Sequence, residues 1–263
     1  MDDSVPLFQQ TLGSLGLDVP PMGETNFEKL VAEYRARLVP GQGPVHLAGM
    51  TTMAECRAAL MAARETDCSP VWVSWACDED GQSLTRVHML AALFVSEGLQ
   101  AAAFGIDCPE EAAQERLTEL AQYARIPLFR VKAGEVTLFP YRRSMEDPDV
   151  IPCATATAPC FVTRTVDVGE EIECGPDLLE DIIAAEDNPV GAVKIAIHEE
   201  DDVEIFAQNQ YAVREALCLY SDVPELLEGA LRVYQGRAFY DGTGGLERAE
   251  LERLSRLYGL IVL

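Results

Sequence analysis

Short apolar segments alternate with longer segments of helical spacing along most of the chain, and this alternation limits the possible folds most strongly. A strand–helix–strand order favours a parallel sheet or a barrel. In the first part of the chain we predict strands at Val45–Ala48, Val71–Trp75, Ala101–Gly105 and Leu128–Val131. The helices predicted between them are Thr52–Glu65, Val87–Glu97 and Glu110–Ala124.

The same alternation returns in the last part of the chain. The predicted strands there are Phe161–Val166, Val193–Ile197, Ala216–Tyr220, Arg237–Tyr240 and Leu260–Leu263. The predicted helices are Pro176–Ala185, Val203–Arg214, Val223–Val233 and Glu247–Leu257. The segment between the two parts, residues 136–160, contains several prolines and no long amphipathic period, which is typical of a linker or crossover.

These segments predict four regions in one α/β fold. Residues 1–44 form an N-terminal arm and a helix that opens on the capping box Thr25–Glu28, residues 45–135 and 161–263 carry the strands and helices, and 136–160 links them. The count of about eight or nine strands matches a single (βα)₈ barrel. Two isolated half-barrels would each expose a sheet edge and an apolar face. We therefore expect one composite barrel or two docked partial barrels.

Charge and cysteine usage exclude several function classes. With 44 acidic against 20 basic residues, the net charge of −24 repels phosphate backbones and anionic lipid, so we expect no nucleic-acid or membrane partner. Eight scattered cysteines without a CxxC motif predict reduced thiols. The start "MDDSVPLFQQ" is unlike a signal peptide, and no segment approaches the ~20 apolar residues of a membrane helix. A cytoplasmic protein is expected.

Several motifs occur in an order known from one enzyme family. "AARE", "DEDGQSLT" and "GIDC" follow one another and precede "LTELAQYARIPLFRVKAGE". This stretch resembles the homocysteine S-methyltransferase domain, including the first barrel of cobalamin-dependent methionine synthase. The stretch "LCLYSDVPELLEGALRVYQGRAFYDGTGG" resembles part of the second, methyltetrahydrofolate-binding barrel of that enzyme. The matches cover parts of both barrels, so the chain resembles a shortened relative.

The resemblance implies a metal-binding role for Cys108, the last residue of "GIDC". In the family, the cysteine at this strand end is one of three thiolates that bind zinc, which activates the thiol of homocysteine. The other two come from a Gly-Gly-Cys-Cys run that is not in this sequence. Cys153 and Cys160 are the candidates to complete a three-sulfur zinc site. The alternative is that Cys108 is a small, partly buried residue at a strand-to-helix turn.

The resemblance also implies substrate-binding residues. In the folate-binding barrel, carboxylate and amide side chains at strand ends hydrogen-bond the pterin ring. The corresponding positions here are Asp167, Tyr220 and Asp241, and the two aspartates keep the acceptor of the family's asparagine but not its donor. Gly81 lies in "DEDGQSLT". In one barrel, these four residues and Cys108 would gather at the carboxyl-terminal face.

Two function classes follow. The first is a methionine-synthase-like protein of one-carbon and methionine metabolism, a methyltransferase if active, that acts on homocysteine, another thiol or a methyl donor. The second is a non-catalytic scaffold that binds a corrinoid protein or a methyltransferase. The absent cysteine pair favours the second class, as does Ala48, which stands where the family has an acidic residue. The matches through "DEDGQSLT" and "GIDC" favour the first.

Overall fold

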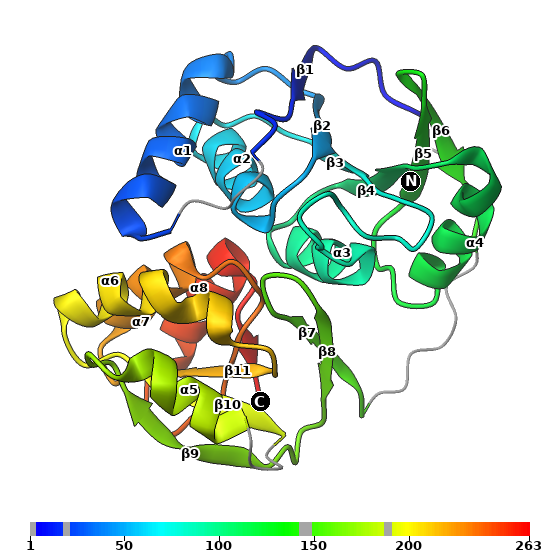
Figure 1. Cartoon of the computed structure of the whole chain (residues 1–263). Helices are drawn as coiled ribbons and strands as arrows, with labels where there is room; N and C mark the ends of the chain where they lie inside the picture. The colour runs from blue at the N-terminus through cyan, green and yellow to red at the C-terminus, as the bar shows by residue number, and fades with distance from the viewer. Residues whose placement is uncertain (1–3, 18–21, 142–148, 187–190) are drawn as a thin grey trace. The chain divides into compact units, whose positions relative to one another are not determined.

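The computed structural model describes residues 4–17, 22–141, 149–186 and 191–263, which fold into two compact α/β units (Figure 1). The first unit comprises Met1–Pro20 and Glu28–Glu146, and the second comprises Pro21–Phe27 and Asp147–Leu263. The main boundary between them falls inside the proline-containing segment 136–160. Each unit has its own parallel sheet and its own helices.

The first unit is built on a six-stranded sheet in the order β1-β2-β3-β4-β5-β6. Strands β1 to β5 run parallel, and β6 is antiparallel to β5. Because each strand pairs with its sequence neighbour, right-handed crossovers put the connecting helices on one face of the sheet. The strands are β1 (Gln10–Gly13), β2 (Val45–Met50), β3 (Val71–Ala76), β4 (Ala103–Asp107), β5 (Leu128–Lys132) and β6 (Glu135–Phe139). The helices are α1 (Glu24–Arg37), α2 (Met53–Glu65), α3 (Met89–Gly98) and α4 (Glu110–Ala121).

The other face of this sheet is covered by the N-terminal arm. Phe8 stacks on His46 with 5.0 Å between ring centroids and meets Trp72 edge-on at 5.5 Å. Phe129 completes an aromatic cluster over the amino-terminal ends of β2, β3 and β5. The predicted strands here are apolar on both faces because helices cover one face and this cluster covers the other.

The second unit repeats the same plan. Its five parallel strands lie in the order β13-β12-β11-β10-β9, again with sequence neighbours paired. The strands are β9 (Val168–Glu173), β10 (Ala192–Ala196), β11 (Leu217–Tyr220), β12 (Phe239–Tyr240) and β13 (Ile261–Val262). The helices are α5 (Leu178–Glu186), α6 (Glu200–Asn209), α7 (Pro224–Val233) and α8 (Arg248–Tyr258), with a 3₁₀ turn, η1, at Gln210–Ala212.

A β-hairpin covers the helix-free face of this second sheet. It consists of β7 (Ile151–Ala154) and β8 (Pro159–Val162), and its buried Cys153 and Val162 pack against Ala216, Cys218 and Phe239, among others. Two backbone hydrogen bonds between Ala154 and Arg237 fix the hairpin to the segment before β12. The hairpin therefore fills the amino-terminal half of the sheet face and leaves the carboxyl ends of the strands uncovered by it.

The mixed α/β fold with parallel sheets is confirmed. The described strands pair within separate sheets, with β1, β6, β9 and β13 at the edges, so the pairing does not show one closed barrel.

The strand predicted at Phe161–Val166 is wrong. Proline at 159 favours a hairpin strand over a central one, and the parallel strand begins instead at Val168. The sequence pattern missed β9 because its three glutamates replace the apolar residues expected of a buried strand.

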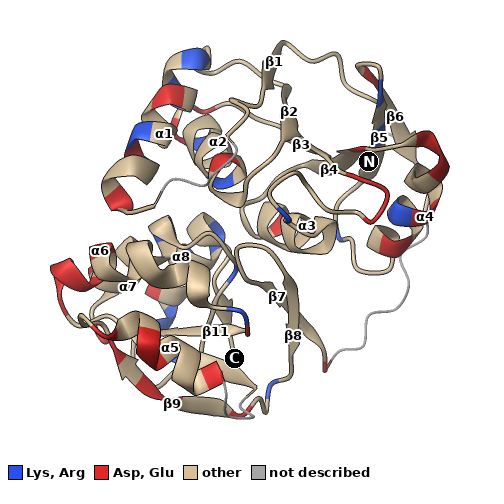
Figure 2. Cartoon of the chain, in the orientation of Figure 1, with Lys and Arg blue, Asp and Glu red and all other residues tan. Residues whose placement is uncertain are grey.

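Acidic residues are concentrated on one part of the second unit. Figure 2 shows them on β9, on α5 and at the start of α6. In the first turn of α6 they satisfy free amide groups, because Glu199 and Asp202 form a capping box. In the part of the chain that the structure describes, no helix is long and apolar enough to span a bilayer.

Candidate functional site

A buried lysine lies at the carboxyl ends of the parallel strands in the second unit. Lys194, on β10, is 9% exposed, and its Nζ donates to Thr243 Oγ1 at 2.8 Å and to Asp241 Oδ2 at 3.1 Å. Glu171 Oε2 lies 3.6 Å from the same nitrogen, and the ring centroid of Tyr220 lies 4.6 Å from it. We call these five residues, together with His198, the Lys194 site.

The register of the sheet brings these side chains together. Lys194 is the partner of Glu171 on β9, while Tyr220 on β11 is the partner of Ala196, two residues further along β10. Asp241 directly follows β12, and its Oδ1 accepts hydrogen bonds from the backbone N and Oγ1 of Thr243. Ligands of parallel α/β folds bind at this end of the strands.

A glycine allows the loop after β12 to lie against this end of the sheet. A Cβ atom on Gly244 would lie 2.3 Å from the carbonyl oxygen of Ser221 and 2.5 Å from Tyr240 Oη. Both distances are far below van der Waals contact, so only glycine fits here without a shift of the backbone. The close approach of this loop to the end of β11 holds Asp241 and Thr243 in place beside Lys194.

Lys194 and Asp241 hold each other in the charged state. Burial acts to lower the pKa of Lys194, but the hydrogen bond and charge of Asp241 outweigh it and the pKa is raised. Burial acts to raise the pKa of Asp241, and the hydrogen bonds from Thr243 and Lys194 bring it below its usual value. Burial, followed by the charge of Asp241, raises the pKa of the neighbouring Cys218 to about 12. Lys194 is therefore a fixed positive charge, not a free amine nucleophile.

Two more exposed side chains form the rim of the site. Glu171 and His198 have side chains that are 37% and 45% exposed, and His198 Nε2 lies 3.6 Å from Glu171 Oε1. The imidazole ring meets the ring of Tyr220 edge-on, with 5.9 Å between centroids. The groups that face an incoming molecule are thus a carboxylate, an imidazole and an aromatic ring, backed by a buried ammonium.

The structure brings together two of the substrate-binding residues expected from the sequence and separates a third. Tyr220 and Asp241 both lie at the Lys194 site. Asp167 lies at the opposite end of the sheet, where its carbonyl oxygen accepts a hydrogen bond from Gly191 N before β10 begins. The reason is that Asp167 precedes β9 instead of ending a strand, so the expectation that it shares the site is corrected.

Sequence reasoning missed Lys194, Glu171 and His198. The signal for Lys194 was present in "AVKIA", where one charged residue interrupts a buried strand. A lysine in a buried strand rarely lies without an anionic partner, so Lys194 predicts a carboxylate close to its ammonium group. Glu171 carried no comparable signal, because β9 was not recognised as a strand, whereas His198 directly follows the predicted strand Val193–Ile197 and its position at the carboxyl end of that strand was a usable signal.

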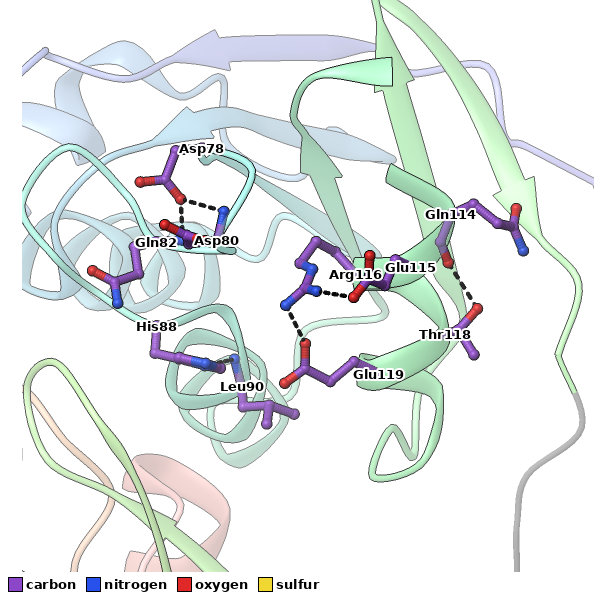
Figure 3. Close-up of polar contacts among 10 residues, drawn as sticks. All are labelled: Asp78, Asp80, Gln82, His88, Leu90, Gln114, Glu115, Arg116, Thr118 and Glu119. Atoms are coloured by element: carbon purple, nitrogen blue, oxygen red, sulfur yellow. Dashed lines mark hydrogen bonds and ion pairs between the residues drawn. The ribbon is translucent and has the colours of Figure 1, made fainter. Parts of the chain in front are cut away.

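Gly81 lies in the first unit, in the loop that follows β3. Figure 3 shows the residues on either side of it, Asp80 and Gln82. Asp78 Oδ1 accepts hydrogen bonds from the backbone N of Asp80 and Gln82, and His88 Nδ1 accepts one from Leu90 N at the start of α3. Gly81 has φ +72°, and a Cβ there would lie 3.1 Å from Arg116 Cδ. These contacts form the turn, and Gly81 belongs to a different unit from Tyr220 and Asp241.

Cys108 also lies in the first unit, directly after β4. Its thiol neighbour is Cys77, which follows β3, and burial is the main cause that raises the pKa of both thiols. Cys153 and Cys160 belong to the second unit, where they face each other in the hairpin. Among the described residues, no three or more His, Cys, Asp or Glu side chains are grouped as metal ligands. Within each unit taken by itself, the described thiols do not assemble the three-thiolate zinc set of the family, and the set that would join Cys108 to Cys153 and Cys160 stays a prediction.

Comparisons with known proteins show no family. No family model and no curated protein matches the chain. One similar solved structure is a putative dihydrodipicolinate synthase family protein from Coccidioides immitis, with 12% identity and a TM-score of 0.30 over 88% of this chain and 66% of that one. Another is the ketoreductase PlmKR1 of phoslactomycin biosynthesis from Streptomyces sp. HK803, with 12% identity and a TM-score of 0.31 over 96% and 82% of the two chains. At these TM-scores neither likeness defines the fold.

Proposed function

We propose that this protein is a methionine-synthase-like protein of one-carbon metabolism whose second unit binds a pterin-type methyl donor at the Lys194 site. The observation that carries the proposal is the position of this site. A buried ammonium, two carboxylates and an aromatic ring gather at the carboxyl ends of parallel strands, and two of these groups, Tyr220 and Asp241, belong to the segment whose sequence resembles the methyltetrahydrofolate-binding barrel. In this proposal the two sheets are partial barrels of the TIM-barrel type.

The chemistry of the rim suits a pterin. The pyrimidine edge of a pterin presents N–H donors beside a carbonyl acceptor, and its rings are flat. Glu171 is the carboxylate with exposed surface, and it accepts N–H donors, whereas Asp241 is occupied by Lys194 and Thr243. The imidazole of His198 can donate to the carbonyl, and the ring of Tyr220 offers a contact surface to the heterocycle.

The test is calorimetric titration of the whole protein with methyltetrahydrofolate. We expect saturable binding by the wild type and at least a tenfold loss of affinity in Glu171→Gln, because the amide presents an N–H donor where the carboxylate offers only acceptors. Asp167→Asn is the matched control. Asp167 is an exposed acidic residue of the same unit at the other end of the sheet, and we expect its substitution to leave the affinity unchanged.

Two outcomes contradict this function. One is the absence of any heat of binding at millimolar methyltetrahydrofolate. The other is an equal loss of affinity in Glu171→Gln and in Asp167→Asn. Either result would direct attention to the scaffold function, for which the probe is direct binding of a purified corrinoid protein.

A further inference from the structure

Two cysteines face each other across the hairpin on the helix-free face of the second sheet. Cys153 on β7 and Cys160 on β8 are directly opposite partners in the antiparallel register. Because side chains of directly opposite residues point to the same side of an antiparallel pair, the two thiols are neighbours on one face of the hairpin. The turn between the strands is short, with Thr155 N donating to the oxygen of Ala158.

This register brings the two Cα atoms into the distance range of a disulfide. Directly opposite residues of antiparallel strands have Cα atoms about 4.5 or 5.5 Å apart, depending on the type of pair. Both values fall within the ~4.4–6.8 Å range of disulfides. The hairpin is also fixed at both strands, through the Ala154–Arg237 hydrogen bonds and through the packing of Val162 against the sheet.

The two thiols differ in their access to solvent. Cys153 is 0% exposed, whereas Cys160 is partly exposed. One thiol is therefore open to a reagent, and the other is covered beside it. In thiol–disulfide exchange, an accessible thiol forms the first bond with the reagent and a neighbouring thiol resolves it.

We propose that Cys153 and Cys160 form a reversible dithiol–disulfide pair that is oxidised by a small disulfide such as glutathione disulfide. Cys160 releases its proton to solvent, and its thiolate attacks one sulfur of glutathione disulfide, so that the S–S bond breaks and one glutathione leaves as a thiolate. Cys153 gives its proton to that thiolate and attacks Cys160 Sγ. The second glutathione leaves and takes a proton from solvent. Two protein thiols are oxidised and one glutathione disulfide is reduced to two glutathiones.

The consequence of oxidation belongs to the second unit alone. The disulfide closes a short ring over residues 153–160, and the hairpin it locks is the segment that covers Ala192, Cys218 and Phe239. A cross-link of this kind removes conformational freedom from the unfolded chain more than from the folded one. The oxidised protein is therefore the more heat-resistant form. This inference does not depend on the proposed pterin site.

The test is incubation of the reduced whole protein with glutathione disulfide, alkylation with iodoacetamide and mass spectrometry of a non-reducing digest. We expect one peptide that contains both Cys153 and Cys160, lighter by two hydrogen atoms than the reduced peptide and not alkylated, which takes up iodoacetamide at both cysteines after treatment with dithiothreitol. We also expect a higher melting temperature after oxidation. In Cys153→Ala, Cys160 should retain glutathione as a mixed disulfide, because the resolving thiol is absent. In Cys160→Ala, the rise in melting temperature should be lost.

The pair Cys77 and Cys108 is the internal comparison, because these thiols are also neighbours but lie beyond the ends of two parallel strands. Cys77→Ala should leave both the hairpin cross-link and the rise in melting temperature unchanged. Full alkylation of Cys153 and Cys160 after oxidation would overturn the proposal. A cross-link between Cys77 and Cys108 in place of the hairpin pair would overturn it too.

Discussion

Lys194 occupies a strand whose other residues are alanine, valine and isoleucine, and its ammonium is buried among carboxylate, hydroxyl and aromatic neighbours. Taking such a charge out of water is costly, so the site exists only because Asp241 and Thr243 replace the lost hydration. The same neighbours fix the geometry of the rim, since Glu171 is held between the ammonium and His198.

Substitution of Lys194 by methionine should destabilise the protein by about 3 kcal/mol, because Asp241 is left as a partly buried charge without its cation. Urea denaturation of the two proteins measures this difference. Lys132→Met is the matched control. Lys132 pairs with Glu110 on the surface, with side chains 60% and 62% exposed, so a change within about 0.5 kcal/mol is expected. An equal loss of unfolding free energy in both variants would show that the buried ion pair of Lys194 with Asp241 stabilises the protein no more than a surface ion pair does.

His46 makes the stability of the first unit depend on pH. Its ring is buried between Phe8 and Phe129, its Nε2 is 2.9 Å from Ser74 Oγ, and burial lowers its pKa from 6.5 to about 4. The unfolded chain therefore binds the proton at a higher pH than the folded one. The stability from this group is complete above pH 6.5 and falls as the pH drops towards 4, by up to about 3 kcal/mol.

The variant His46→Gln separates this effect from the titration of the carboxyl groups. Glutamine keeps a hydrogen-bonding group near Ser74 but does not titrate, so its unfolding free energy should fall less steeply than that of the wild type between pH 6.5 and 4. Urea denaturation at several pH values measures both slopes. Parallel curves for the two proteins would mean that the His46 imidazole is protonated at the same pH in the folded and unfolded states.

At the scale of elements, each sheet needs a cover for the face that its helices leave open. In the first unit the cover is the N-terminal arm with Phe8, and in the second it is the β7–β8 hairpin. The carboxyl ends of the second sheet lie beyond this cover, and the Lys194 site is found there.

Truncation of the arm's aromatic contact gives a direct test of the first cover. Phe8→Ala should expose Trp72 to water, shift tryptophan emission to longer wavelength and lower the unfolding free energy by about 1–3 kcal/mol. Leu7→Ala is the matched control, since the neighbouring Leu7 is 92% exposed. If Phe8→Ala has the emission spectrum of the wild type, the arm does not shield Trp72.

Elements with a strong apolar period were predictable, and those shaped by context were not. The helix α2 and the strand β3 differ from their predicted bounds by one residue at one end, because a buried element leaves a clear pattern. The strand β9 was missed because its exposed glutamates hide the period of two, and β7 and β8 because prolines suggested a linker. The same holds for the site. Tyr220 and Asp241 end recognisable strands, whereas Glu171 reaches Lys194 only through the pairing of β9 with β10.

At the scale of the whole molecule, both units follow one plan. Each has five parallel strands paired in sequence order, and each needs long crossover helices whose polar faces lie in water. The composition makes most of these polar residues acidic, which leaves a net charge of −24. A net charge of this size makes separate molecules repel one another. The acidic side chains within each unit also repel one another, which favours the unfolded chain.

The stability of the protein should therefore rise with ionic strength. Glu170 and Glu173 on β9 are exposed, and α5 and α6 carry further acidic residues. At low salt these carboxylates repel one another, and added salt weakens the repulsion by screening it. We expect the melting temperature to increase between about 10 mM and 200 mM sodium chloride, where the screening length falls from about 30 Å to below 10 Å. The double variant Glu170→Gln with Glu173→Gln should melt higher than the wild type at low salt and respond less to added salt. A melting temperature that falls with salt in both proteins would show instead that attractive ion pairs, such as Arg253 with Glu228, outweigh the repulsion.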